Sequence, residues 1–276
     1  MERIITLALN EDIGAGDITS HALIPAAARG RACCRARQAL VVCGLPVAER
    51  VFHHLDDSLQ VTLRLPERAQ AETGQTLLEV EGTVRSILTA ERVMLNLLQR
   101  MCSVATQTHR FVQAVHDLPV TLLDTRKTMP CLRVLDQYAV AVGGGTNHRR
   151  RLDDMLLIKD NHLACVPSLE EAVRRARQAY PEVPLVVECD TPAQVKEALD
   201  TGPDRLLLDN MPPQLLREVV ALVDGRVPLE ASGNTTLENV RAIAQTGVEY
   251  ISVGRLTHSV PTVDIGLDWD NLDGTQ

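Results

Sequence analysis

Six short apolar runs, rich in Val, Leu and Ile, recur along the chain from about residue 119 onward, and each run ends in polar residues. Such runs are typical of strands that are buried on both faces of a parallel sheet. The runs are VTLLDTRK (120–127), DMLLIKDNH (154–162), PLVVECD (184–190), DRLLLDN (204–210), VPLEASGN (227–234) and YISVGRLTH (250–258). Because amphipathic segments separate most of them, the order predicts an α/β fold with a parallel sheet, either a (β/α) barrel or a doubly wound sheet.

Capping signals mark the ends of several of the intervening helices. Small polar residues stand where helices should begin, and glycines stand where a left-handed residue should end them. The predicted caps are Ser168 with Glu171, Thr191 with Pro192, and Thr235 with Glu238, and the predicted terminating residues are Gly202 and Gly247.

Polar and small residues follow the predicted strands. In both architectures the carboxyl ends of the strands line the binding site, so we expect these residues to form a polar pocket. They are Arg126, Lys127, Lys159, Glu188, Asp209, Ser232 and Gly254. The short segment from Asn147 to Arg149 is the candidate for a seventh strand, and a barrel of this size would be incomplete.

The first part of the chain has a different pattern. Alternation in LQVTLRL (59–65) and TLLEVEG (76–82) predicts half-buried antiparallel strands, and GRACCRARQALVVCG (30–44) supplies one or two more. A long helical run, residues 86–115, leads into the α/β part. We expect an α+β domain over residues 1–110, joined by the C-terminal tail 262–276, and a barrel-like domain over residues 111–261.

The composition argues against a nucleic-acid-binding protein and a membrane protein. The formal net charge is -8, which argues against a general nucleic-acid binder. No window approaches the roughly 18 apolar residues of a membrane span, and MERIITLALNEDIG makes a poor signal peptide, so we expect a cytoplasmic protein with no membrane partner. The seven cysteines include no CxxC pair and are expected to be buried, reduced thiols.

Against this acidic background, one segment is strongly basic. Between Arg126 and Arg151 the chain has six basic residues and one acidic residue, a local net charge of +5. Arginine binds carboxylates and phosphates bidentately, so the segment predicts a site for a ligand with several anionic groups. We expect Arg149 to face such a site and Arg150 to lie, with Arg151, on a solvated surface. The glycines at 143–145 serve either a close backbone approach or a tight connection.

Two carboxylates and several small residues extend the candidate site. Glu188 and Asp209 either bind a divalent cation shared with phosphate oxygens or form salt bridges with nearby basic residues. The segments ASGN (231–234) and SVGRLTH (252–258) offer small residues and backbone amides for a phosphate. His148 and His162 are either acid/base groups or hydrogen-bonded structural residues. The sequence contains no nucleophile elbow, Rossmann fingerprint or P-loop.

Nine segments, in order along nearly the whole chain, resemble the signature segments of the quinolinate phosphoribosyltransferase family. They are EDIGAGDIT (11–19), LNLLQR (95–100), TRKTMPCLR (125–133), GGGTNHR (143–149), LLIKDNH (156–162), VVEC (186–189), LLLDNM (206–211), LEASGN (229–234) and SVGRLTHS (252–259). The resemblance implies an N-terminal open sandwich, an incomplete barrel of about seven strands, and a homodimer, or a higher oligomer, with shared active sites.

The resemblance also implies a reaction and the roles of residues. Quinolinate and phosphoribosyl pyrophosphate (PRPP) would give nicotinate mononucleotide, pyrophosphate and CO2, with Mg²⁺ as cofactor. By their motif positions, the residues around quinolinate are Arg126, His148, Arg149 and Lys159, together with Arg100 from the partner subunit. The residues at PRPP include Lys127, and Glu188 and Asp209, which act through Mg²⁺ and the ribose hydroxyls. The residues at the 5-phosphate of PRPP are Ser232, Gly233, Gly254 and His258. The implied catalytic residues are Lys127, Lys159, Glu188 and Asp209.

The segments depart from the family pattern beside the site. Thr146 stands where a histidine is usual and Arg151 where a glycine is usual, Cys131 replaces a glycine, and the SG of another motif reads Cys102-Ser103. Two alternatives stay open. One is a paralogue of the molybdenum-transport-associated type that acts on another aromatic acid, and the other is a non-catalytic binding protein. The retained cations argue against the first, and the retained carboxylates argue against the second.

Overall fold

The computed structural model describes residues 1–273, with side chains described through Asp270. The chain divides into two compact units. The first comprises 1–107, 130–143 and the described part of 260–276, and the second comprises 108–129 and 144–259. Within the described residues, no helix is both long enough and apolar enough to cross a membrane. The tail residues 274–276 lie outside the described part of the chain.

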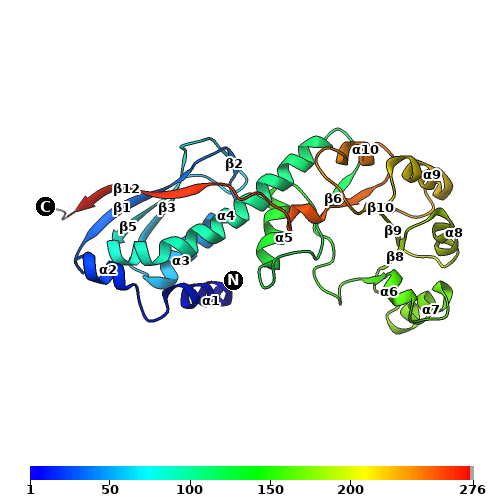
Figure 1. The fold of residues 1–276 in the computed structure, drawn as a ribbon, viewed down its shortest axis with the longest axis horizontal. Helices are drawn as coiled ribbons and strands as arrows, with labels where there is room; N and C mark the ends of the chain where they lie inside the picture. The colour runs from blue at the N-terminus through cyan, green and yellow to red at the C-terminus, as the bar shows by residue number, and fades with distance from the viewer. Residues whose placement is uncertain (274–276) are drawn as a thin grey trace. The chain divides into compact units, whose positions relative to one another are not determined.

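The first unit contains a four-stranded antiparallel sheet in the order β12-β1-β5-β3 (Figure 1). The strands are β1 (Arg29–Ala36), β3 (Gln60–Leu63), β5 (Thr76–Thr83) and β12 (Ile265–Asp273), so the three strands expected in residues 30–82 are confirmed. β12 pairs with β1 along its length, which places the C-terminal segment in this sheet. The second strand within 30–44 is β2 (Leu40–Val41), which pairs with β4 (Gln70–Ala71) in a separate small sheet.

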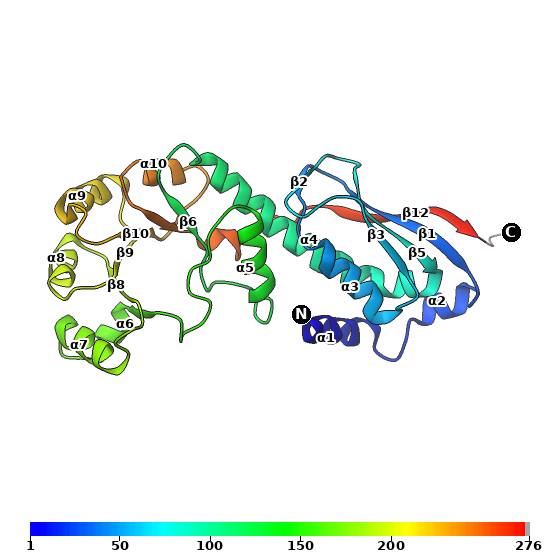
Figure 2. The same ribbon diagram turned by 180° about the vertical axis from the view of Figure 1, so that it is seen from behind.

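Helices cover one face of this sheet. α3 (Leu45–Leu55) and the first part of α4 (Val84–Ala114) lie along it in both views (Figures 1 and 2), and the long helix α4 was expected over nearly the same residues. The unit also contains α1 (Glu2–Ile13), α2 (Ile18–Leu23) and α5 (Arg133–Val142). Alternation along β1 points the buried Ala32 and Cys34 to the helices.

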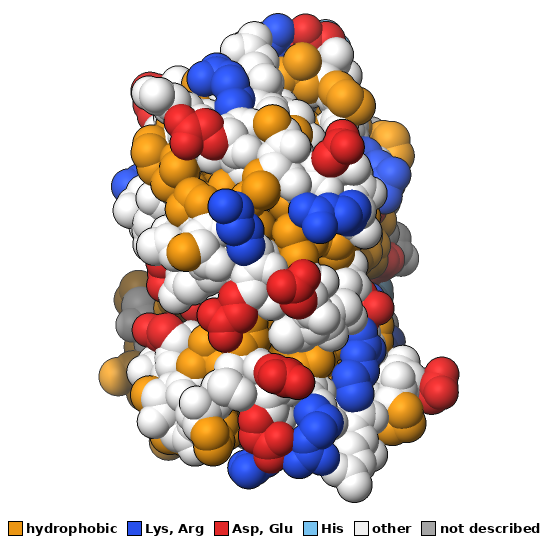
Figure 3. All heavy atoms as spheres, turned by 90° about the vertical axis from the view of Figure 1, so that its right-hand side faces the viewer, with side chains coloured by type: hydrophobic (Ala, Val, Ile, Leu, Met, Phe, Trp, Pro, Cys, Tyr) orange, Lys and Arg blue, Asp and Glu red, His pale blue; other side chains and the backbone are white. Residues whose placement is uncertain are grey.

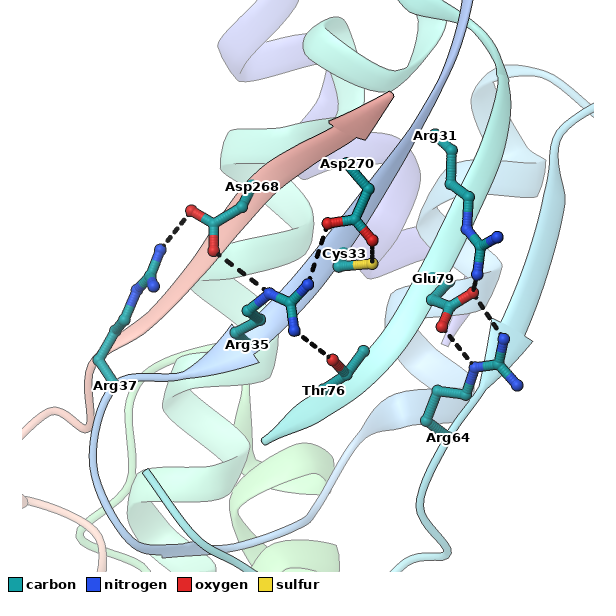
Figure 4. A network of polar contacts seen from close by, with 9 residues as sticks. All are labelled: Arg31, Cys33, Arg35, Arg37, Arg64, Thr76, Glu79, Asp268 and Asp270. Carbon is teal, nitrogen blue, oxygen red and sulfur yellow. Dashed lines mark hydrogen bonds and ion pairs between the residues drawn. The ribbon is translucent and has the colours of Figure 1, made fainter. Parts of the chain in front are cut away.

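The other face of the sheet carries ion pairs, as Figure 4 shows. Arg35 bonds to Asp270 at 2.9 Å, and the Cys33 thiol donates to the same carboxylate at 2.7 Å. Arg31 and Arg64 share Glu79. Opposite charges therefore stand across neighbouring strands, which is a favourable arrangement for a solvated sheet face.

The second unit contains a six-stranded parallel sheet in the order β6-β11-β10-β9-β8-β7. All six strands expected from the apolar runs are confirmed. They are β6 (Thr121–Leu123), β7 (Leu156–Ile158), β8 (Leu185–Cys189), β9 (Arg205–Asp209), β10 (Leu229–Ser232) and β11 (Tyr250–Ser252). The connecting helices are α6 (Asp160–Leu163), α7 (Leu169–Ala179), α8 (Pro192–Asp200), α9 (Pro213–Val223) and α10 (Val240–Ala244), and the short helix η1 (Gly254–Leu256) follows β11.

The expected seventh strand at 147–149 is wrong, and the strand count is six. Only Thr146 forms a single bridge, with Leu123 of β6. Two residues later the backbone N–H of His148 donates to the carboxylate of Asp124 at 2.7 Å. Because this side chain takes the amide proton that a ladder would need, strand pairing ends after Thr146.

Two of the three expected helix starts are confirmed. Ser168 accepts from the Glu171 amide, and Thr191 caps α8 with Pro192 as its first residue. The cap at Thr235 with Glu238 is wrong, because α10 begins only at Val240 with Asn239 as its N-cap. The expected left-handed glycines are confirmed, since Gly202 has φ 68° and Gly247 has φ 98°.

The cysteines are free, but not all are buried. Five lie in the interior, whereas Cys131 and Cys165 are exposed, which corrects the expectation of wholly buried thiols. On the face shown in Figure 3, basic and acidic side chains lie interspersed, in keeping with a surface that has no extended basic stripe there.

Candidate functional site

A cavity of about 400 Å³ lies within the second unit, at the carboxyl ends of the parallel strands. Every strand of the sheet contributes to it, either by its last residues or by those that follow. The lining residues are Thr125, Arg126, Lys127, His148, Arg149, Leu157, Lys159, Glu188, Leu207, Asp209, Glu230, Ser232 and Ser252. Eight of the expected site residues therefore come together: Arg126, Lys127, His148, Arg149, Lys159, Glu188, Asp209 and Ser232.

Two guanidinium groups share one part of this cavity. Arg149 Nη1 donates to the Met155 carbonyl at 2.9 Å, which fixes one edge of the group. Burial and then the nearby charge of Arg126 hold the pKa of Arg149 below its usual value. Two cations crowded in this way repel each other, and an anion between them would relieve that cost. This part of the cavity thus suits a carboxylate or phosphate.

Lys159 and Glu188 form an ion pair across two neighbouring strands. Lys159 stands directly after β7 at the start of α6, where its backbone N–H donates to His162 Nδ1 at 3.1 Å. His162 is therefore a capping residue, and it does not line the main cavity. A lysine paired in this way is held in the cavity and can exchange its partner for an incoming anion.

An amide chain holds the second carboxylate. Asn210 Nδ2 donates to Asp209 Oδ2 at 2.7 Å, and Asn234 Nδ2 donates to Asn210 Oδ1 at 3.0 Å. Both asparagines have positive φ, 54° for Asn210 and 51° for Asn234, a conformation that asparagine tolerates better than most residues. The end of β9 is thereby tied to the loop after β10.

Two glycines allow close approaches next to the cavity. A Cβ on Gly233 would lie 2.1 Å from Asn210 Oδ1, and one on Gly254 would lie 2.8 Å from His258 Nε2 and 3.2 Å from Lys127 Cδ. Because Gly254 has no Cβ, the side chains of Lys127 and His258 can both lie close to it. Partial burial and then the charges of Lys127 and Arg255 lower the pKa of His258. Gly233, Gly254 and His258 lie at the rim, outside the lining itself.

Three polar residues of the cavity lining were missed by the sequence analysis: Thr125, Glu230 and Ser252. Glu230 is fully buried and Ser252 is 4% exposed, and the fully buried Asp124, which directly precedes Thr125, was missed as well. Glu230 accepts from Arg205 Nη1 at 3.0 Å and lies 3.2 Å from His148 Nε2. A signal was present, because a charged residue inside an otherwise apolar strand is rarely buried without a partner or a function.

Arg100 is the expected site residue that lies elsewhere. It belongs to the first unit, where its Nε and Nη2 each donate to the fully buried Asp136 at 2.8 Å. It does not line the cavity of its own chain. Its assignment to a partner's site stays a prediction.

The carboxylates do not form a complete metal site by themselves. Among the described residues, no group of three or more His, Cys, Asp or Glu side chains could hold a metal ion. Mg²⁺, however, commonly uses one or two carboxylates, several waters and the phosphates of its substrate. Glu188 and Asp209, at neighbouring strand ends, fit that incomplete donor set.

These features define the class as an α/β protein whose parallel sheet ends in a cavity lined by basic side chains and three carboxylates. Comparison with known families finds matches to both domains of a single family. The N-terminal domain of quinolinate phosphoribosyl transferase matches residues 17–102, and the C-terminal domain matches residues 104–268. The chain belongs to the quinolinate phosphoribosyl transferase family.

Relatives and solved structures agree with this assignment. A nicotinate-nucleotide pyrophosphorylase (carboxylating) of Mycobacterium leprae is 44% identical over 270 residues, covering 96% of this chain and 95% of that protein. A probable enzyme of the same name from Bacillus subtilis is 40% identical, covering 94% and 89%. The crystal structure of nicotinate-nucleotide pyrophosphorylase from Ehrlichia chaffeensis has a TM-score of 0.94 at 38% identity, covering 98% of each chain.

Proposed function

We propose that the chain transfers the phosphoribosyl group of PRPP to quinolinate with loss of a carboxyl group, giving nicotinate mononucleotide, pyrophosphate and CO2, as a step of de novo NAD biosynthesis. The observation that carries the proposal is the gathering of Arg126, Arg149, Lys127 and Lys159 around one cavity. Quinolinate is a dianion, and more than one cation is needed to offset its desolvation. The names of the relatives support the same reaction.

The reaction needs no covalent nucleophile on the protein. The pyridine nitrogen attacks the anomeric carbon of the ribose while pyrophosphate leaves, so the site has to align two reactants and stabilise separated charge. Arg126 and Arg149, with His148 beside them, are assigned to quinolinate. Lys159 can pass from Glu188 to a substrate carboxylate. After transfer, the cationic ring nitrogen stabilises the carbanion that remains when CO2 departs, and this carbanion takes up a proton to give nicotinate mononucleotide.

PRPP is assigned to the other side of the cavity. Lys127 faces the leaving diphosphate, and Ser232, Gly233, Gly254 and His258 frame the 5-phosphate. Glu188 and Asp209 would hold Mg²⁺ together with the phosphate and ribose oxygens. When bound by these residues, Mg²⁺ would supply positive charge that stabilises the departing diphosphate. The amide bond from Asn210 keeps the Asp209 carboxylate oriented.

We further propose a homodimer in which Arg100 of each subunit serves the partner's site, in a cytoplasmic protein. The bidentate contact with buried Asp136 supports this role, because it holds the guanidinium in one orientation. The six parallel strands together with the bridge at Thr146 are the basis for proposing an incomplete barrel. The functional limits 1–110 and 111–261 are part of the same proposal.

The decisive assay incubates the purified protein with quinolinate, PRPP and Mg²⁺ and follows the loss of quinolinate and the release of CO2. We expect turnover that requires all three components. Nicotinate replaces quinolinate in the control. Activity with nicotinate and none with quinolinate would reject the proposal, and activity with another aromatic acid alone would favour the paralogue.

A further inference from the structure

Glu230 is an unexpected residue for a cavity that collects anions. It lies in β10, its side chain has no exposed surface, and it lines the cavity. Its Oε2 accepts from Arg205 Nη1 at 3.0 Å, whereas Oε1 lies 3.2 Å from His148 Nε2 in a close polar contact that lacks the alignment of a hydrogen bond. Burial favours the neutral acid, but the contacts with His148 and Arg205 outweigh it and hold the pKa of Glu230 below its ordinary value. The residue is therefore an ionised carboxylate in the wall of the cavity.

The hydrogen bonds of His148 define where its proton resides. Its Nδ1 accepts from the backbone N–H of Arg149 at 2.7 Å, so Nδ1 carries no proton. The neutral ring must then be protonated on Nε2, which is the nitrogen that faces Glu230. The histidine thus bridges a buried carboxylate and the amide of the next residue.

Arg149 is held at two points as a result. Its amide is bonded to the His148 ring, and its guanidinium Nη1 is bonded to the Met155 carbonyl. The remaining part of the guanidinium borders the cavity. If the His148 ring turned or took its other tautomer, the amide bond would be lost and Arg149 would be free to shift.

We propose that Glu230 is a positioning residue: the negative charge of its carboxylate, 3.2 Å from His148 Nε2, favours the tautomer that carries the proton on Nε2 and anchors Arg149, and so sets the affinity of the cavity for a pyridine carboxylate. The identity of that ligand rests on the proposed function. Glu230 does not touch the ligand in this scheme. It acts through His148.

The first test separates this role from a merely structural one. In Glu230→Gln the carboxylate charge is removed, and the single amide oxygen can face only one of Arg205 and His148. We expect KM for quinolinate to rise roughly tenfold, the usual cost of removing one partner of a buried polar contact, while KM for PRPP changes less than about twofold. The matched control is Arg205→Met, which removes the other partner of Glu230 and lies outside the cavity lining.

Arg205→Met should lower Tm and leave KM for quinolinate within about twofold of the wild type, because the carboxylate of Glu230 stays beside His148 Nε2. If both variants lower Tm and neither changes KM for quinolinate, Glu230 is only a structural partner of Arg205 and the proposal is overturned. An equal rise in KM for both substrates in Glu230→Gln overturns it as well.

A double-mutant cycle tests whether the effect passes through His148. His148→Asn keeps a short side-chain acceptor for the Arg149 amide but cannot reach Glu230. Adding Glu230→Gln to this variant should change KM for quinolinate by less than about twofold, since the connection is already absent. A further tenfold rise would show that Glu230 acts independently of the ring.

Nitrogen NMR of the imidazole provides a test that needs no substrate. In the wild-type protein we expect His148 Nε2 to carry the proton and Nδ1 to be unprotonated, and Glu230→Gln to alter the Nε2 signal. A proton on Nδ1 in the wild type would refute the proposed tautomer. Inactivity of the wild type toward quinolinate and PRPP would instead refute the proposed function, so the two failures are distinguishable.

Discussion

Gly233→Ala is expected to damage the site through one added methyl group. Gly233 has φ 93°, and a Cβ there would lie 2.1 Å from Asn210 Oδ1 and 2.9 Å from the Asn210 backbone nitrogen. The amide could rotate away, but the backbone atom cannot do so without moving the loop. The left-handed conformation costs about 1–2 kcal/mol for a residue with a Cβ, and overpacking adds about 1–3 kcal/mol.

The same loop carries the bond that orients Asp209. When Asn210 is displaced, Asp209 loses its 2.7 Å amide bond, so the effect reaches the carboxylate assigned to Mg²⁺ and ribose. We expect Tm to fall by several degrees, at about 2–4 °C per kcal/mol for a unit of this size. KM for PRPP should rise about tenfold with little change for quinolinate, which corresponds to about 1.4 kcal/mol of binding.

Gly225→Ala is the matched control. Gly225 also has positive φ, 70°, but a Cβ there meets nothing within 4 Å, so this variant carries the conformational cost without the clash. It should lose about 1 kcal/mol of stability and keep its kinetic constants. Thermal unfolding and steady-state kinetics on both variants decide the matter. Equal losses of stability with unchanged KM in both would refute the argument that the close approach positions the site.

Three further predictions concern the two arginines of the cavity, the imidazole of His258, and the thiols of Cys33 and Cys131. Arg126→Ala and Arg149→Ala should each raise KM for quinolinate far more than KM for PRPP, and equal effects on both would mean that the pocket is misassigned. Partial burial and two nearby cations lower the pKa of His258, so near neutrality it is largely unprotonated in the free protein, and an arriving phosphate should draw a proton to it. Calorimetry in buffers of different ionisation enthalpy should therefore detect proton uptake on PRPP binding that His258→Asn abolishes. Burial and then a neighbouring carboxylate raise the pKa of the Cys33 thiol to about 11, so iodoacetamide at neutral pH should label exposed Cys131 long before Cys33, as peptide mass spectrometry would show.

The sequence predicted the features that depend on short-range pattern. Apolar runs located the six parallel strands, and the residues at their ends formed one cavity because carboxyl ends of parallel strands meet at one edge. The prediction of a seventh strand was wrong for a non-local reason. The backbone N–H of His148 donates to Asp124, which lies 24 residues earlier in the chain, and not to a neighbouring strand. Glu230 was missed for a similar reason, because its meaning depends on His148 and Arg205, which only the folded sheet brings to it.

Subunit sharing of the active site can be tested by pairing two inactive chains. Under the proposal, Arg100 serves the partner's cavity while Lys127 serves its own, so a heterodimer of Arg100→Ala and Lys127→Ala contains one intact site and one doubly defective site. Purified through two different affinity tags, it should show about half the wild-type activity, although each homodimer is nearly inactive. A heterodimer of Lys127→Ala and Lys159→Ala, whose altered residues line the same cavity, should stay inactive because neither site is intact. If the first heterodimer is as inactive as the second, Arg100 acts within its own chain, and its tight contact with Asp136 has a purely structural purpose.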